Sequence, residues 1–281
     1  MVRFLTDLGE FAFLQHAVLA ALLVSVSSGM IGCYVVVRRI TYIAGGVAHC
    51  VLGGMGAARY LQVVHGADWL HPMHGAIAAA LLAALVIGWV ALRAREREDT
   101  AIGALWAVGM AAGVLFIAAT PGYAEDLMGY LFGNILMVGR SDLYLIGGLD
   151  LLVLAAVVLF YNQFFAVCYD EEFARLRGVR TDLFYLLLLA LVALTVVLLV
   201  TVVGIVMVIA LLTLPVATAG RFSRTLPRMM LYSTLLSALL SLSGLVASYG
   251  PNLPAGAVIV LLAGAVYLVA AVGHAVLGRT G

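Results

Sequence analysis

Histidine residues occur in two settings that suggest metal chemistry, because imidazole nitrogens are ligands for zinc and neighbouring transition metals. One of them, His49, lies inside a long apolar segment. A polar side chain in such a segment is costly unless it is partnered or functional, so its position alone makes His49 a candidate ligand. The alternative is that the ring only hydrogen-bonds a neighbouring backbone carbonyl.

The second setting is the polar connection HGADWLHPMH, in which side chains that can bind zinc recur at three-residue intervals. They are His65, Asp68, His71 and His74. Pro72 interrupts a regular helix here, so the spacing alone does not bring these side chains together. We expect either a weak capture site for an arriving ion or polar residues that collect at a membrane interface without a ligand role. Glu125 and Asp126, in the next outer connection, are weaker candidates.

A dense block of both charge signs, DEEFARLRGV at 170–179, interrupts two long apolar segments. A helix with this many charges must lie outside a membrane. Glu171 and Arg175 have the i, i+4 spacing of an ion pair, while Gly178 followed by Val179 is better suited to ending a helix than to extending it. We interpret 168–179 as a cytoplasmic helix that docks on a partner. The alternative is an ordinary charged loop.

These side chains must be positioned by transmembrane helices. Of the 281 residues, 65% are hydrophobic and only 10% are charged. Several apolar runs reach about 20 residues, the length of a helix that crosses a ~30 Å hydrocarbon core, and the alternating strands of an outer-membrane barrel are not seen. We therefore predict an all-α, polytopic integral membrane protein with a single membrane domain over residues 1–281 and one cytoplasmic coupling helix.

Nine crossings satisfy the pattern, and eight result if one element is re-entrant. The expected spans are 11–37, 47–63, 75–92, 101–119, 143–164, 183–200, 202–219, 229–248 and 255–277. A break is expected near 201–204, because one helix over 183–219 would extend about 55 Å at ~1.5 Å per residue. The apolar part of 121–142 is too short to span, so we expect a short outer or half-buried helix there.

Arginine residues orient these spans through the positive-inside rule. They gather in alternate connections, at Arg38, Arg39, Arg93, Arg95, Arg97, Arg175, Arg177, Arg180, Arg221, Arg224, Arg228 and Arg279. We expect those connections to be cytoplasmic, which places the N-terminus outside and the C-terminus in the cytoplasm. The histidine-rich connection then faces the outer side.

Several functions are disfavoured by what the sequence lacks. All 15 basic residues are Arg, so the chain cannot contain the lysine of a phosphate-binding GxxxxGK loop. The spans hold few ionisable residues, and neither HExxH nor GxSxG occurs, which argues against a secondary transporter or an intramembrane enzyme. The three cysteines, Cys33, Cys50 and Cys168, imply no disulfide framework.

Five segments occur in an order and spacing that resemble a known transporter family. They are VVVRRITYIAGGVAH (35–49), DLMGYLFGNIL (126–136), DEEFARLRGV (170–179), VVGIVMVIALLTLPVATA (202–219) and LPAGAVIVLLAG (253–264). With them the chain resembles the membrane permeases of the zinc and manganese ABC importer family (ABC-3 family) over nearly its whole length. The resemblance implies import of a divalent metal ion, whether zinc, manganese or iron, across a bacterial inner membrane.

The same resemblance implies partners and no ATPase activity of this chain. Two copies would form the pathway among the membrane lipids, two ATP-binding cassette subunits would bind and hydrolyse ATP below them, and an extracytoplasmic metal-binding protein would deliver the ion. No cofactor would be bound permanently, and no nucleic-acid partner is expected. The residues that couple to the ATPase would be Asp170, Glu171, Glu172, Ala174, Arg175 and Gly178.

The sequence departs from the family pattern at Gly45. The family usually has an Asp four residues before the histidine that corresponds to His49, and this spacing places both side chains on one helical face. Gly45 offers no carboxylate. One explanation is that other ligands rebuild the site, with Cys50 and His16 as the nearest, although a free intramembrane Cys more often only packs. The other is a permease of the ABC type for a non-metal substrate or a chelated cofactor.

Overall fold

The structure is a computed structural model that describes residues 2–93, 98–121, 133, 135–205, 208–251 and 253–277. Helices account for nearly all of this part of the chain, which contains no strand, so the prediction of an all-α protein is confirmed. The elements are α1 (Val2–Glu10), α2 (Ala12–Arg38), α3 (Thr41–His65), α4 (Pro72–Arg93), α5 (Glu98–Ala119), the 3-10 helix η2 (Ile135–Met137), α7 (Arg140–Leu159), α8 (Tyr161–Tyr169), α9 (Glu171–Leu176), α10 (Thr181–Val203), α11 (Val208–Phe222), α12 (Leu226–Tyr249) and α13 (Ala255–Leu277).

Seven helices of the described residues are long and apolar enough to cross a membrane. They are Ala12–Arg38, Pro72–Arg93, Asp99–Ala119, Arg140–Leu159, Thr181–Val200, Leu226–Tyr249 and Ala255–Gly273. The two other predicted spans coincide with α3, which is long enough but less apolar, and with α11, whose 15 residues measure about 22 Å. The polytopic architecture is confirmed, and the predicted count of eight or nine spans is approximate.

The predicted break in the longest apolar run is also confirmed. Helix α10 ends at Val203, and Gly204 follows with a φ of +81°, a conformation that favours glycine. Gly133 lies against this break, and a Cβ atom on it would be 2.4 Å from the carbonyl carbon of Val203. The two glycines allow one helix to end and the next to begin within a tightly packed region. Of the helix predicted over 121–142, residues 122–132 and 134 lie outside the described residues.

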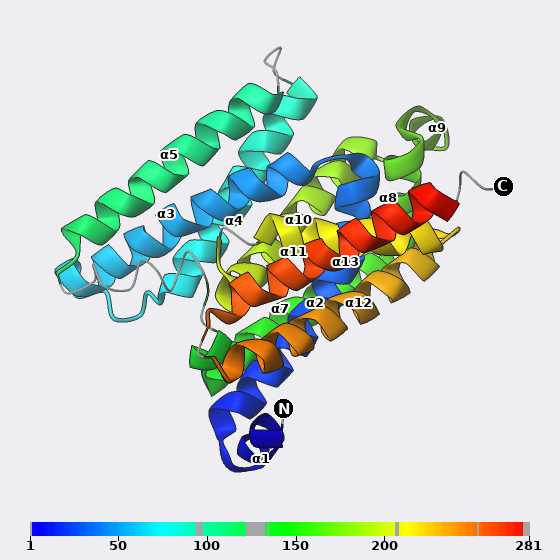
Figure 1. The fold of residues 1–281 in the computed structure, drawn as a ribbon. Helices are drawn as coiled ribbons and strands as arrows, with labels where there is room; N and C mark the ends of the chain where they lie inside the picture. Colours follow the sequence, from blue (N-terminus) through cyan, green and yellow to red (C-terminus); the bar gives the residue numbers. More distant parts are fainter. Residues whose placement is uncertain are drawn as a thin grey trace.

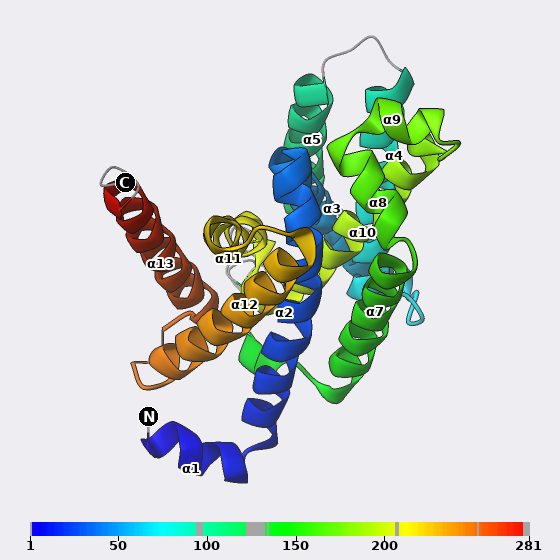
Figure 2. The ribbon, with the colours of Figure 1, turned by 90° about the vertical axis from the view of Figure 1, so that its right-hand side faces the viewer.

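The connections predicted to be cytoplasmic lie toward one end of the bundle. The α2–α3 turn, the end of α4, helix α9, the α11–α12 turn and the end of α13 lie toward the upper right of Figure 1, whereas α1 and the α12–α13 turn lie at the other end (Figures 1 and 2). Connections that face the same side of a membrane are expected to share the Arg excess. The arrangement of the helices is consistent with the pattern of arginines in the sequence.

Glycines allow α3 to pack closely against α4 and α5. A Cβ atom on Gly54 would lie 2.2 Å from the carbonyl oxygen of Gly75 in α4. One on Gly53 would lie 2.8 Å from the carbonyl oxygen of Gly109 in α5. Small residues at such contacts let helix backbones approach in a membrane, where no hydrophobic force drives helices together. Helix α3 is thereby held between its two neighbours.

We expect the substitution Gly54→Ala to destabilise the protein by about 1–3 kcal/mol, the usual cost of overpacking a filled interior. The added methyl group would meet backbone of α4 rather than a flexible side chain, so α3 and α4 would have to separate. Thermal unfolding in detergent, followed by circular dichroism, measures this effect. Gly264→Ala in α13 is the matched control, because nothing lies within 4 Å of its new Cβ atom. An unchanged melting temperature for Gly54→Ala would contradict the close α3–α4 contact.

Candidate functional site

His49 is held in α3 with one ring nitrogen engaged and the other available. The side chain is 8% exposed, and its Nδ1 lies 2.9 Å from the carbonyl oxygen of Gly45, one helical turn earlier. A carbonyl oxygen can only accept, so Nδ1 carries the proton and the neutral ring keeps the lone pair on Nε2. Histidines that bind metals commonly donate their other N–H to a backbone carbonyl in this way. The orientation of His49 therefore suits ligation through Nε2.

The indole of Trp106 in α5 covers one face of the His49 ring. The ring centroids are 4.2 Å apart and the planes are inclined by only 25°. Gly45 makes room for this arrangement, because a Cβ atom there would lie 2.9 Å from Cζ3 of Trp106 and 2.7 Å from Cδ1 of Ile209. The space that an aspartate at position 45 would need is thus occupied by Ile209 and Trp106. Sequence analysis did not identify Trp106, since nothing in the local pattern links it to His49.

Cys50 and His16 are not brought together with His49. The Cys50 thiol donates to the carbonyl oxygen of Leu105 at 3.3 Å, which fixes it in the α3–α5 contact. His16 is half-buried near the start of α2, about 33 Å along the helix from its end at Arg38, whereas His49 lies about 12 Å into α3. No group of three His, Cys, Asp or Glu side chains within the described residues could hold a metal ion. The structure places His49 as a single candidate ligand.

The histidine-rich connection is exposed but does not form a joint site. His65, Asp68, His71 and His74 are all exposed. Nδ1 of His74 accepts from the backbone N–H of His71, and Nδ1 of His71 accepts from the backbone N–H of Met73, both at 3.3 Å. His65 instead packs edge-on against Tyr60. Two of the three imidazoles therefore bind free N–H groups at the start of α4. Glu125 and Asp126 lie outside the described residues.

The charged block forms a short helix, α9, with a defined cap at each end. The Asp170 carboxylate accepts from the backbone N–H of Phe173 at 2.9 Å, which is an N-cap. At the other end Gly178 has a φ of +80°, its N–H donates to Arg175, and the N–H of Val179 donates to Ala174. This paired pattern is the Schellman motif, which ends a helix at a glycine. The helix is shorter than the 168–179 expected from the sequence, because α8 and α9 meet at Asp170.

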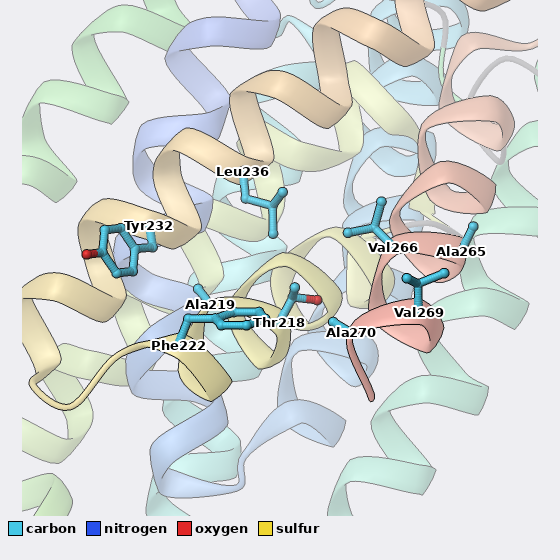
Figure 3. Close-up of a pocket in the computed structure, with 9 residues that line it drawn as sticks. All are labelled: Thr218, Ala219, Phe222, Tyr232, Leu236, Ala265, Val266, Val269 and Ala270. Carbon is cyan, nitrogen blue, oxygen red and sulfur yellow. The ribbon is translucent and has the colours of Figure 1, made fainter. Parts of the chain in front are cut away.

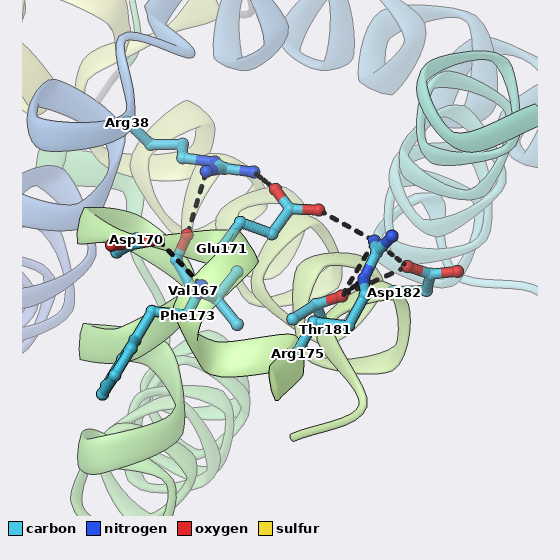
Figure 4. Close-up of polar contacts among 8 residues, drawn as sticks. All are labelled: Arg38, Val167, Asp170, Glu171, Phe173, Arg175, Thr181 and Asp182. Carbon is cyan, nitrogen blue, oxygen red and sulfur yellow. Dashed lines mark hydrogen bonds and ion pairs between the residues drawn. The ribbon is translucent and has the colours of Figure 1, made fainter. Parts of the chain in front are cut away.

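A chain of charged contacts ties α9 to three other helices (Figure 4). The Arg38 guanidinium, at the end of α2, forms an ion pair with Glu171 and donates to the carbonyl oxygen of Val167 at 2.9 Å. On its other side Glu171 pairs with Arg175 at 3.3 Å. Arg175 also contacts Asp182, at the start of α10, at 3.2 Å. The expected i, i+4 pair of Glu171 and Arg175 is confirmed. The contact with Arg38, 133 residues away in sequence, was not predicted.

The outer face of α9 carries exposed apolar side chains. Phe173 is 53% exposed and Leu176 is 87% exposed, and Glu172 is also exposed beside them. Ala174 is buried, at 1%, where α9 meets the rest of the protein. Apolar side chains grouped on a charged helix outside the membrane region are typical of a surface that contacts another protein. Their position favours docking over the alternative of a simple solvated loop.

Two further features lie away from His49. Helices α11, α12 and α13 enclose a groove of about 640 Å³, whose lining is almost wholly apolar and includes Phe222, Leu236 and Val266, and it offers no metal ligands (Figure 3). Asp150 in α7 is 5% exposed and accepts from the backbone N–H of Ser27 in α2 at 3.2 Å. Sequence analysis gave Asp150 no role, although a lone carboxylate in an apolar span is itself a sign of a functional residue.

We expect Gly45→Asp to lower the melting temperature, because the new side chain would collide with the rigid indole of Trp106. The double substitution Gly45→Asp, Trp106→Ala removes that collision and should recover part of the loss, so that the two effects are non-additive by about 0.5–3 kcal/mol. Thermal unfolding of the two single variants and the double variant measures the coupling. Strictly additive losses would show that Trp106 does not occupy the space beside Gly45.

Comparisons with known proteins agree on one family. Residues 10–274 match the model of the ABC 3 transport family. A probable metal transport system membrane protein of Chlamydia pneumoniae is 45% identical over 249 residues, which cover 89% of this chain and 85% of the relative. The manganese transport system membrane protein MntC of Halalkalibacterium halodurans is 33% identical, with coverage of 95% and 89%. A chain of the solved complex of PsaBC from Streptococcus pneumoniae with Fab superimposes with a TM-score of 0.85 at 31% identity, covering 96% and 94%.

Proposed function

Because the chain belongs to the ABC 3 transport family, we propose that it is the transmembrane permease subunit of an ATP-binding cassette importer that moves a divalent metal ion into the cytoplasm. Zinc, manganese and iron are the candidate ions. The relatives named for metal and manganese transport support this substrate class. The observation in this chain that carries the proposal is His49, whose Nδ1 is engaged by Gly45 while Nε2 keeps its lone pair.

In this mechanism His49 binds the ion only transiently. A structural zinc site is closed by four ligands, whereas a transport site must release its ion again. A single neutral imidazole with a fixed orientation replaces part of the lost hydration without enclosing the ion. Trp106 shields one face of the ring and helps to exclude water from it. Cys50 and His16 remain proposed secondary ligands, which would require α2 and α5 to shift relative to α3.

We assign ATP hydrolysis to a separate subunit that docks on α9. The absence of Lys from the sequence excludes a phosphate-loop lysine in this chain. The exposed side chains of Glu172, Phe173 and Leu176 support a docking surface there. Asp170 and Gly178 define the ends of that helix, while Ala174, Glu171 and Arg175 attach it to the rest of the protein.

The remaining partners follow from the family and from the position of the connections. We propose a second copy of the chain as the other half of the pathway and an extracytoplasmic metal-binding protein as the donor of the ion. The location is a bacterial inner membrane, with the N-terminus outside and the C-terminus in the cytoplasm, which the shared end of the Arg-bearing connections supports. The exposed side chains of His65, Asp68, His71 and His74 would then meet the ion first.

A second candidate function is import of a chelated metal or an organic cofactor. The observation that favours it is the pair of Gly45 and Trp106, which puts an aromatic ring where the family usually has a carboxylate. An aromatic face stacks well on a flat conjugated ligand. Such a substrate would need neither Nε2 of His49 nor a deprotonated thiol.

Uptake into membrane vesicles distinguishes the two functions. Vesicles would contain the chain, its ATPase and its binding protein, and would be loaded with ATP. ATP-dependent entry of radiolabelled zinc or manganese, competed by the unlabelled ions and abolished by withholding ATP, is the expected result. A complex that assembles and hydrolyses ATP but moves none of the ions, iron included, would contradict the metal proposal and favour the chelate.

A further inference from the structure

We propose that Arg38 is a positioning residue that transmits movement of the docking helix α9 to α3, and so to His49 and Trp106. The inference rests on the proposed function in one respect, namely that α9 binds the ATPase. It adds a specific connection between that surface and the candidate ligand. Sequence analysis treated Arg38 only as one of the arginines that orient the spans.

Arg38 contacts three helices that meet at the docking end of the bundle, and Figure 4 shows its contacts with two of them, α8 and α9. Its guanidinium forms an ion pair with Glu171 at the start of α9 and donates to the Val167 carbonyl in α8. It also lies over the Tyr185 ring of α10, 5.4 Å from the ring centroid. The planar guanidinium can make all three contacts at once, which a lysine could not. One side chain therefore links α2 to the docking helix and to its neighbours on both sides.

Among the ion pairs that the described residues form around α9, the Arg38–Glu171 pair is the best shielded. The two side chains are 24% and 31% exposed, whereas Arg175 and Asp182 are 65% and 62% exposed. Exposed pairs are weakened by solvent and salt, and shielded charge-assisted contacts are weakened less. A displacement of α9 would therefore pull first on Arg38.

The turn after Arg38 is short and hydrogen-bonded, so a displacement of the end of α2 is transmitted to α3. Arg39 has a φ of +60°, the only positive value at a non-glycine residue within the described part of the chain. The N–H of Arg39 donates to Val36, and that of Ile40 donates to Val35. Helix α3 begins at Thr41, and His49 lies eight residues later, about 12 Å along the helix. The α2 end, the turn and the first turns of α3 are thus one continuous hydrogen-bonded unit.

The fluorescence of Trp106 reports movement at the far end of this connection whether or not the transported substrate is known. The chain has three tryptophans, Trp69, Trp89 and Trp106. The background is Trp69→Phe, Trp89→Phe, and the partner subunits are prepared without tryptophan. Trp106 is then the only tryptophan of the complex that emits. We expect ATP binding to the assembled complex to change its emission, because α3 moves relative to α5 and the stack with His49 is disturbed. No response to ATP in this background would overturn the proposal.

The decisive comparison uses Arg38→Gln and Glu171→Gln. Both remove one charge of the pair. Glu171→Gln keeps the length of the side chain, whereas Arg38→Gln shortens it. We expect both to reduce the response of Trp106 to ATP by about tenfold, within the usual range of coupling between sites. Binding of the ATPase to Arg38→Gln should stay within about twofold of the intact protein, because Arg38 lies outside α9 and the exposed face of α9 is unchanged. Arg39→Asn is the matched control. Arg39 forms no ion pair within the described residues, so this substitution removes a neighbouring charge without breaking a contact. Asparagine tolerates the positive φ of this position.

A charge exchange separates a direct contact from a general loss of stability. The double variant Arg38→Glu, Glu171→Arg should respond to ATP more strongly than either charge-reversed single variant, because the ion pair is rebuilt with opposite polarity. Absence of rescue, or a full response in Arg38→Gln, would overturn the proposal. Glu172→Arg tests the proposed docking independently, because it should lose the ATPase itself. If that variant binds normally, α9 is not the docking surface and the premise of the proposal fails. If it loses the ATPase while Arg38→Gln keeps a full response, the docking surface stands and only the role of Arg38 is wrong.

Discussion

Replacing His49 by Ala is expected to reduce metal uptake by about 10- to 100-fold, the size of effect seen when the environment of a metal ligand is disturbed. The fold should survive, because the ring packs on Trp106 and makes one hydrogen bond within its own helix. Binding of the ATPase should also survive, since α9 lies at the end of the bundle away from this contact. Initial rates of zinc and manganese uptake into vesicles, set against the amount of assembled complex, measure the effect.

Cys50→Ser is the matched control for His49→Ala. Serine keeps a donor for the carbonyl oxygen of Leu105 and removes the thiolate as a ligand. Uptake close to that of the intact protein is expected if the thiol only packs between α3 and α5. If uptake fell equally in both variants, the ion would be held by the thiol as well as the imidazole. Unchanged uptake in His49→Ala would show that His49 does not contact the transported ion.

Reversing the charge of Glu172 is expected to weaken binding of the ATPase subunit by at least about tenfold, because an unfavourable charge at an interface costs more than 1 kcal/mol. Glu172 is exposed beside Phe173 and Leu176, and the described residues give it no ion pair within the chain. Its partner is therefore expected on the docked subunit. Co-purification of the ATPase with Glu172→Arg, and titration in detergent, measure the loss.

Arg180→Gln provides the control for Glu172→Arg. Arg180 is exposed two residues beyond Gly178, and the described part of the chain gives it no ion pair. Changing its charge should leave the affinity for the ATPase within about twofold, as is usual for a residue at the rim of an interface. If Glu172→Arg bound as tightly as the intact chain, α9 would not be the docking surface, and its exposed Leu176 would need another explanation.

The helices and their breaks could be predicted because they depend on local composition. Long apolar runs, the Arg-rich connections and the break at Gly204 each follow from a few consecutive residues. The end of α9 at Gly178 is equally local, since only glycine readily takes the φ observed there. The length of α9 was overestimated, because Asp170 is the cap of a new helix rather than part of a longer one.

The contacts between distant segments could not be predicted in the same way. Trp106 stacks on His49 and Arg38 pairs with Glu171 because of how helices pack, and no pattern within either segment encodes those pairs. The three-residue spacing of His65, Asp68, His71 and His74 left open whether they form a weak capture site. In the structure, backbone N–H groups at the start of α4 donate hydrogen bonds to Nδ1 of His71 and Nδ1 of His74. Regular spacing does not imply convergence when a proline begins the next helix.

The most direct test of the central claim is X-ray absorption spectroscopy of the zinc-loaded complex, trapped during transport with a non-hydrolysable ATP analogue. The metal passes His49 if the spectrum of the intact complex contains a nitrogen shell at about 2.0–2.1 Å that is lost or diminished in His49→Ala. Trp106→Ala should keep that shell, because the indole supplies no ligand. An identical spectrum in the intact complex and in His49→Ala would contradict the assignment of His49 as the intramembrane contact of the ion.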